Sequence, residues 1–184
     1  RSTSSTSPVV QALGLVGVVV GLWMVLERAQ RPAEGLPDPV EPPPMAAATE
    51  AACPQDQPLA AAALAAQDEL EAESMRERSP FVPGDGLAAL PLFARAASCY
   101  AATGQPERAR ELQAAAAQLR SRLADEIHLR HVRLERYLAE DRYAEARQQA
   151  QLLAELVAVK TGPYAEWLSA VQREGELRSE MEGR

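Results

Sequence analysis

Residues 87–104, LAALPLFARAASCYAATG, decide the fold, together with PERARELQAAAAQLRSRLADE at 106–126. Small and apolar side chains recur at helical spacing in both segments, and the first segment ends at Gly104. Glycine is the natural left-handed end of a helix, and Pro106 suits the first turn of the next helix. The stretch therefore predicts a helical hairpin.

The composition extends this prediction to the whole chain. Aromatic residues make up 4% of the 184 residues and alanine dominates, which suits close helix packing better than a sheet sandwich. The fold class is therefore expected to be all-α. The length leaves no room for two large enzyme cores, and a net charge of -7 argues against binding of nucleic acid.

Further helices are expected on both sides of the hairpin. A first helix is predicted from Leu59 to Arg78, followed by a loop at FVPGDG, residues 81–86. Gly162 and Pro163 stop the preceding helix and start a final one. The final helix would cap the exposed end of the helical stack, with these residues on its apolar side: Tyr164, Trp167, Leu168 and Val171.

The hairpin resembles a tetratricopeptide repeat, in which two antiparallel helices pack through small residues and aromatic residues fill the gaps. The first unit matches the family pattern at Phe93, Ala97, Tyr100, Gly104, Ala109, Ala116 and Leu119. A fainter second unit has Tyr137, Asp141, Tyr143, Ala146 and Leu153, with Leu134 in a small-residue position and Asp141 in place of the turn glycine. The resemblance covers residues 90–160 and implies a stack of helical pairs that binds other proteins.

The boundary between these two units is not marked by glycine or proline. Asp125 is the expected boundary, acting as a helix cap, and one continuous long helix is the alternative. The helical domain as a whole is predicted to occupy residues 59–184.

An apolar segment near the start predicts a membrane span. Residues 9–26, VVQALGLVGVVVGLWMVL, form a helix of about 27 Å, close to the thickness of a bilayer core. A buried core helix is the alternative, although the polar tail 1–8 and the arginines after the segment disfavour it. Gly14, Gly17 and Gly21 share one face, where a partner helix in the membrane could pack closely.

The linker at residues 27–58 is acidic, and eight prolines fall between residues 32 and 58. It is expected to be extended, reaching up to about 80 Å, either as a solvated linker or as a strap along a larger complex. The Arg- and Ser-rich start is typical of a processed organellar protein, with a bacterial signal anchor as the alternative.

No motif for catalysis is present, so the sequence assigns no catalytic residue, no cofactor and no metal. His128 and His131 stand on one predicted helix face within reach of Glu135, but zinc normally needs more ligands, and an ordinary polar face is the favoured interpretation. Cys53 and Cys99 are left open as free thiols, as a disulfide, or, for Cys99, as a small core residue.

The expected function is that of a non-catalytic, single-pass accessory subunit or scaffold in a larger membrane complex, contacting lipid and other subunits. The expected location is the mitochondrial inner membrane, in a respiratory-chain or ATP synthase assembly, with the helical domain in the intermembrane space. The alternative is an anchored peptide-binding receptor or chaperone, including one in a bacterial inner membrane. Its binding groove would draw on Arg95, Arg108, Arg130 and Arg133. An enzyme is a third, weaker possibility.

Overall fold

The computed structural model describes residues 35–45, 51–158 and 160–182, and within these ranges every regular element is an α-helix. The all-α prediction is confirmed for this part of the chain. The helices are α2 (Pro58–Arg78), α3 (Pro83–Ala102), α4 (Pro106–Ala139), α5 (Tyr143–Val157) and α6 (Pro163–Glu182).

The predicted membrane span at residues 9–26, with Gly14, Gly17 and Gly21, lies outside the described residues. Among the helices that are described, none combines the length and the apolar character needed to cross a bilayer.

Helix α3 begins four residues earlier than expected. The predicted loop at 81–86 is wrong in its second half, because residues 83–86 form the first turn of α3. Proline is preorganised for a first helical position, and Nε of Arg78 donates a 2.8 Å hydrogen bond to Asp85 in that turn. The α2–α3 connection is therefore short and fastened by an ion pair.

Helix α4 is continuous over 34 residues, so the boundary predicted at Asp125 is wrong and the alternative of one long helix is correct. Asp125 lies exposed in the middle of the helix. Buried side chains continue at helical spacing on both sides of it, at Leu119, Leu123 and Ile127. An uninterrupted apolar face without glycine or proline gives the chain no reason to break.

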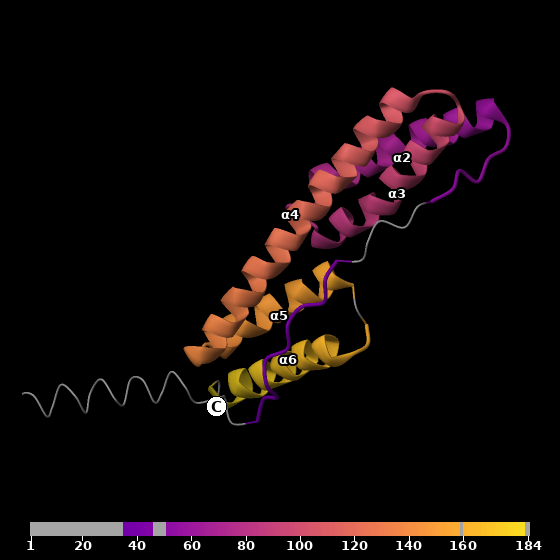
Figure 1. Ribbon diagram of the computed structural model, residues 1–184. Coiled ribbons are helices and arrows are strands. Elements are labelled where there is room, and N and C mark those ends of the chain that lie inside the picture. The colour runs from indigo at the N-terminus through magenta and orange to yellow at the C-terminus, as the bar shows by residue number, and fades with distance from the viewer. Residues whose placement is uncertain (1–34, 46–50, 159, 183–184) are drawn as a thin grey trace, which may run out of the picture.

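The other helices are arranged around α4 as two antiparallel hairpins (Figure 1). Helix α3 packs beside the first half of α4 and has α2 packed against it, while α5 packs beside the second half of α4 and has α6 packed against it. Helix α3 also contacts α5. At about 1.5 Å per residue α4 is about 50 Å long, which lets one helix serve both hairpins.

Two turns of the same type flank α4. Gly104 has a φ of 79° and Asp141 a φ of 57°, and both lie in the left-handed region. The amide that follows each donates to a carbonyl five residues earlier, Gln105 to Tyr100 at 2.9 Å and Arg142 to Tyr137 at 2.8 Å. Asp141 thus occupies the position of the turn glycine, as expected from the spacing.

The core is built mainly from alanine and leucine, with few aromatic residues. Small side chains let helices approach closely, as they do where α6 packs on α5. A Cβ on Gly175 would lie 2.8 Å from the carbonyl oxygen of Tyr143 and from Cβ of Arg147. The buried alanines are Ala61, Ala65, Ala72, Ala89, Ala96, Ala97, Ala109, Ala116, Ala146 and Ala150.

Candidate functional site

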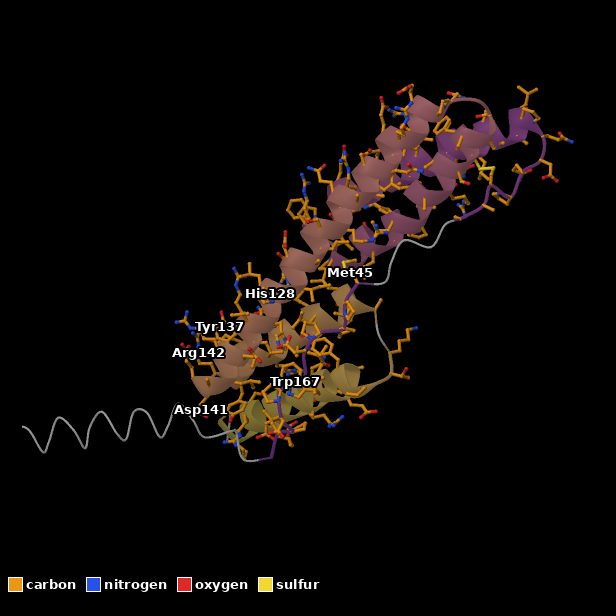
Figure 2. All side chains as sticks on the ribbon, viewed as in Figure 1. Met45, His128, Tyr137, Asp141, Arg142 and Trp167 are labelled. Carbon is orange, nitrogen blue, oxygen red and sulfur yellow. A yellow bond between two sulfur atoms is a disulfide. The ribbon has the colours of Figure 1, made fainter. Side chains whose placement is uncertain are left out.

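The residues predicted to pack the repeat are mostly in the core. Two of them are not: Gly104 is exposed, and Tyr137 is half-buried, with the guanidinium of Arg142 over its ring at 4.6 Å (Figure 2). Gly104 forms the turn described above. The buried members are Phe93, Ala97, Tyr100, Ala109, Ala116, Tyr143 and Ala146.

Three of the four arginines expected in a peptide-binding groove are bound to acidic side chains of the same chain. Arg108 pairs with Glu69 and Glu111, and Nε of Arg130 lies 2.6 Å from Glu126. These partners neutralise the positive charge that a carboxylate ligand would need. Arg95, Arg108 and Arg130 therefore do not offer an unpaired positive charge to a ligand.

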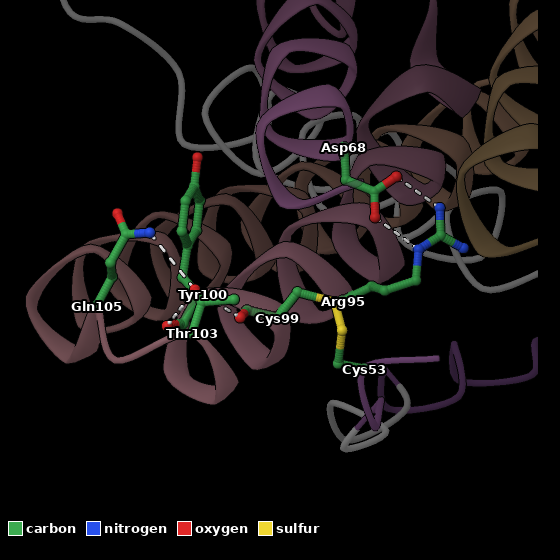
Figure 3. Close-up of a disulfide and its surroundings, with 7 residues drawn as sticks. All are labelled: Cys53, Asp68, Arg95, Cys99, Tyr100, Thr103 and Gln105. Atoms are coloured by element: carbon green, nitrogen blue, oxygen red, sulfur yellow. Dashed lines mark hydrogen bonds and ion pairs between the residues drawn. A yellow bond between two sulfur atoms is a disulfide. The ribbon is translucent and has the colours of Figure 1, made fainter. Parts of the chain in front are cut away.

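Arg95 makes the most complete of these pairs (Figure 3). Its Nε and one terminal nitrogen each donate a 2.6 Å hydrogen bond to Asp68, which is 2% exposed. These hydrogen bonds raise the pKa of Arg95 further above its usual value. A bidentate pair of this kind fixes orientation as well as charge, so it sets how α2 lies on α3.

The two histidines lie in different environments. His131 is buried, while His128 is exposed. The rings of His131, Tyr164 and Trp167 form a triangle: the His131 centroid is 5.8 Å from Tyr164 and 5.5 Å from Trp167, and the latter two are 5.8 Å apart. Nδ1 of His131 is 3.3 Å from the Tyr164 hydroxyl. His131 is thus a core residue, and no cluster of three metal-binding side chains occurs in the described ranges.

The proline-rich linker lies partly on its own helical module. Residues 35–45, here called the strap, run over the α5–α6 hairpin (Figure 1), where Leu36, Val40 and Met45 pack against the core. The charge of Glu41 is near enough to Tyr164 to help raise the pKa of that phenol, after the larger effect of burial. The strap is therefore held on the module of its own chain and is not a fully solvated linker.

A disulfide joins Cys53 to Cys99, with the two Cα atoms 4.7 Å apart (Figure 3). It connects the end of the linker to α3 across 46 residues of sequence. Of the three possibilities left open for the cysteines, the disulfide is the one found. Disulfides persist in oxidising compartments, so this bond bears on where the module works.

A cleft of about 350 Å³ lies where the two hairpins meet. The α2–α3 turn forms one wall, the middle of α4 the floor, and the last turn of α5 closes one end. Its polar residues are Arg76, Ser79, Arg122, Glu126 and Arg130. Its apolar residues are Pro80, Pro83, Leu119, Leu123 and Leu156.

Within this cleft Arg122 is the uncompensated charge. Arg76 is 2.5 Å from Glu73, and Arg130 pairs with Glu126. Arg122 is exposed, and no acidic oxygen within the described residues lies within 4 Å of it. The cleft thus combines nearly buried leucines with an arginine, Arg122, that has no acidic partner among the described residues.

No family model, no curated protein and no solved structure matches this chain.

Sequence reasoning missed the cleft because its lining comes from three separate segments. Arg122 and Leu156 are 34 positions apart in sequence and belong to different helices. No spacing rule links such residues, so only the folded chain brings them together.

Proposed function

We propose that this protein is a non-catalytic, single-pass accessory subunit or scaffold of a membrane complex, with its helical module on the oxidising side of the membrane. The observation that carries the proposal is the Cys53–Cys99 disulfide. A structural disulfide resists the reducing cytosol poorly and persists in the intermembrane space or the periplasm. The mitochondrial inner membrane is the preferred location, and a bacterial inner membrane is the alternative.

The position of the strap is evidence that the module is held close to the bilayer. The apolar sequence 9–26 supplies the anchor in this proposal, and residue 35 already lies at the start of the strap. The intervening nine steps span at most about 30 Å when fully extended. The linker therefore brings the module against the membrane, where it meets the exposed parts of neighbouring subunits.

A binding role is favoured over catalysis by the sequence, which contains no phosphate loop, nucleophile elbow or zinc-protease motif. The module instead offers helical surfaces held by ion pairs such as that of the buried Asp68 with the partly exposed Arg95. Rigid, preorganised surfaces bind partners at low entropic cost.

The test uses native membranes in which thiols are blocked with a maleimide before lysis. The protein is expected to stay in the pellet after alkaline carbonate extraction and to bind a second maleimide only after reduction. Protease added outside the intact inner membrane, in mitoplasts, is expected to digest the module. Recovery in the carbonate supernatant, or thiols that react before reduction, would overturn the proposal.

A second candidate, an anchored peptide-binding receptor or chaperone, is favoured by the arginine-containing cleft. Purification in mild detergent separates the two. An accessory subunit brings a fixed set of partners in equal amounts, whereas a receptor brings many partners in small amounts.

A further inference from the structure

We infer that the cleft between the two hairpins binds a short acidic and apolar peptide segment of a partner protein, with a carboxylate on Arg122 and apolar side chains on the α4 floor. The inference deepens the proposed function, since it names the chemistry that the module recognises.

Charge complementarity is the first support. Acidic residues outnumber basic ones by 26 to 19 in this chain, and the other arginines of the cleft have acidic partners. Arg122 nevertheless stays without one, among the described residues, beside an apolar floor. An arginine in this position offers a planar donor set that fits a carboxylate and is cheaper to desolvate than a lysine.

The exposed apolar residues beside the cleft are the second support. Phe81 is 86% exposed and Val82 is 47% exposed, and both stand in the α2–α3 turn between Pro80 and Pro83, which line the cleft. A large aromatic side chain left in water beside a cavity is typical of a protein contact site. Two apolar side chains are therefore exposed on the turn that borders the cleft, although neither lines it.

The wall of the cleft is preformed. The ion pair between Arg78 and Asp85 fastens the α2–α3 turn, and Gly86 lets α3 approach α4. A Cβ on Gly86 would lie 2.9 Å from Cδ2 of Leu123. The cleft thus exists without a ligand, which reduces the ordering needed for binding.

The size of the cleft favours a peptide over a membrane lipid. A volume of about 350 Å³ accommodates a few side chains and not the paired acyl chains of a phospholipid. A vesicle of anionic phospholipid is the matching control, because it offers negative charge without a peptide.

The experiment measures fluorescence polarisation with the full chain in mild detergent. The probe is a fluorescein-labelled peptide of alternating glutamate and leucine, and the control peptide has glutamine in place of glutamate. We expect the glutamate peptide to bind more tightly, with affinity falling as salt is added.

The decisive variant is Arg122→Glu, with Arg133→Glu as its control. Arg133 is also exposed on α4 and also lacks an ion pair within the described residues, but it does not line the cleft. Arg122→Glu is expected to weaken peptide binding about tenfold or more, and Arg133→Glu less than about twofold. Phe81→Ser is expected to weaken binding as well.

Three results would overturn the inference: equal binding of the glutamine peptide, equal loss in the two arginine variants, or competition by phosphatidylglycerol vesicles stronger than by unlabelled peptide. These failures are distinct from failure of the proposed function. If the protein stays in the pellet after carbonate extraction but does not bind the peptide, only the inference about the cleft is refuted. If it binds the peptide but is extracted by carbonate, only the proposed membrane anchor is refuted.

Discussion

At the scale of single residues, buried polar side chains decide how the helices lie on one another. Asp68 is almost fully buried, while the Arg95 side chain is 40% exposed. Removing Arg95 therefore leaves a buried carboxylate, whereas removing the charge of Asp68 leaves an arginine that reaches water. Tyr164, beside His131, is a second buried polar side chain.

Removing Arg95 is expected to cost more stability than altering Asp68. Arg95→Met leaves a carboxylate buried and unpaired, at a cost of about 3 kcal/mol, whereas Asp68→Asn leaves an arginine that reaches water, at about 1–2 kcal/mol. Urea unfolding measures both changes. Equal losses would mean that the burial of Asp68 does not control the pair.

The second prediction at this scale concerns alkaline pH. Burial, reinforced by the charges of Glu135 and Glu41, raises the pKa of the Tyr164 phenol. A pKa raised in the folded state gives stability that is complete below the unfolded pKa of about 10 and is lost as the pH rises above it.

Tyr164→Phe should therefore make the free energy of unfolding fall less steeply above about pH 10 than in the wild type. Unfolding curves at several pH values test this. Tyr143, whose pKa is also raised by burial, titrates in both proteins and leaves a common slope. Identical pH dependence of the two proteins would contradict the prediction.

At the scale of helices, close approach and turn conformation decide which residues are tolerated. Gly175 sits inside α6 against the backbone of α5, and Gly104 and Asp141 end α3 and α4 in the left-handed region. Gly175 is required by close packing, whereas Gly104 and Asp141 are constrained by backbone conformation. Matched variants distinguish these two effects.

Gly175→Ala is expected to destabilise the protein by about 1–3 kcal/mol, because the added methyl group meets the Tyr143 carbonyl and α6 must shift. Gly84→Ala is the control, since Gly84 is also helical and a Cβ added there would meet no atom of the described residues within 4 Å. It should be neutral or stabilise by up to about 1 kcal/mol. Thermal unfolding compares them, and destabilisation of the same size in both would rule out the close α5–α6 approach.

Losing the glycine at one turn and gaining one at the other are expected to change stability in opposite directions. Gly104→Ala forces a side chain into the left-handed region and should cost about 1 kcal/mol, with no clash to add. Asp141→Gly removes the same strain and should gain about 0.5 kcal/mol. Denaturant midpoints measure both, and a loss of stability in Asp141→Gly would show that the aspartate side chain outweighs the backbone strain.

At the scale of the whole molecule, the disulfide and the strap join the linker to the helices. The disulfide spans 46 residues of sequence, and the strap packs on the opposite hairpin from Cys99. The described parts of the linker thus contact both halves of the molecule.

Loss of the disulfide is expected to destabilise the protein by about 2–4 kcal/mol, because the unfolded chain regains the entropy of an open loop. Cys53→Ser tests this, since Cys53 is the more exposed partner and Cys99 stays in the core. Reductant should lower the urea midpoint of unfolding of the wild type and leave that of the variant unchanged. A wild type that does not respond to reductant would contradict the prediction.

The sequence by itself determined the helices and most of their ends. Helix α2 begins within one residue of its predicted start, and Gly104, Gly162 and the prolines after them mark turns by local backbone preference. The buried face of the last helix was also predictable, because Tyr164, Trp167, Leu168 and Val171 follow a helical period.

Only the tertiary structure decided the rest. The strap, the disulfide and the cleft each join segments far apart in sequence. Periodicity reports the conformation of neighbouring residues. That Cys53 bonds to Cys99, and that Arg122 lies beside Leu156, depends on the path of the whole chain. No local sequence pattern contains that information.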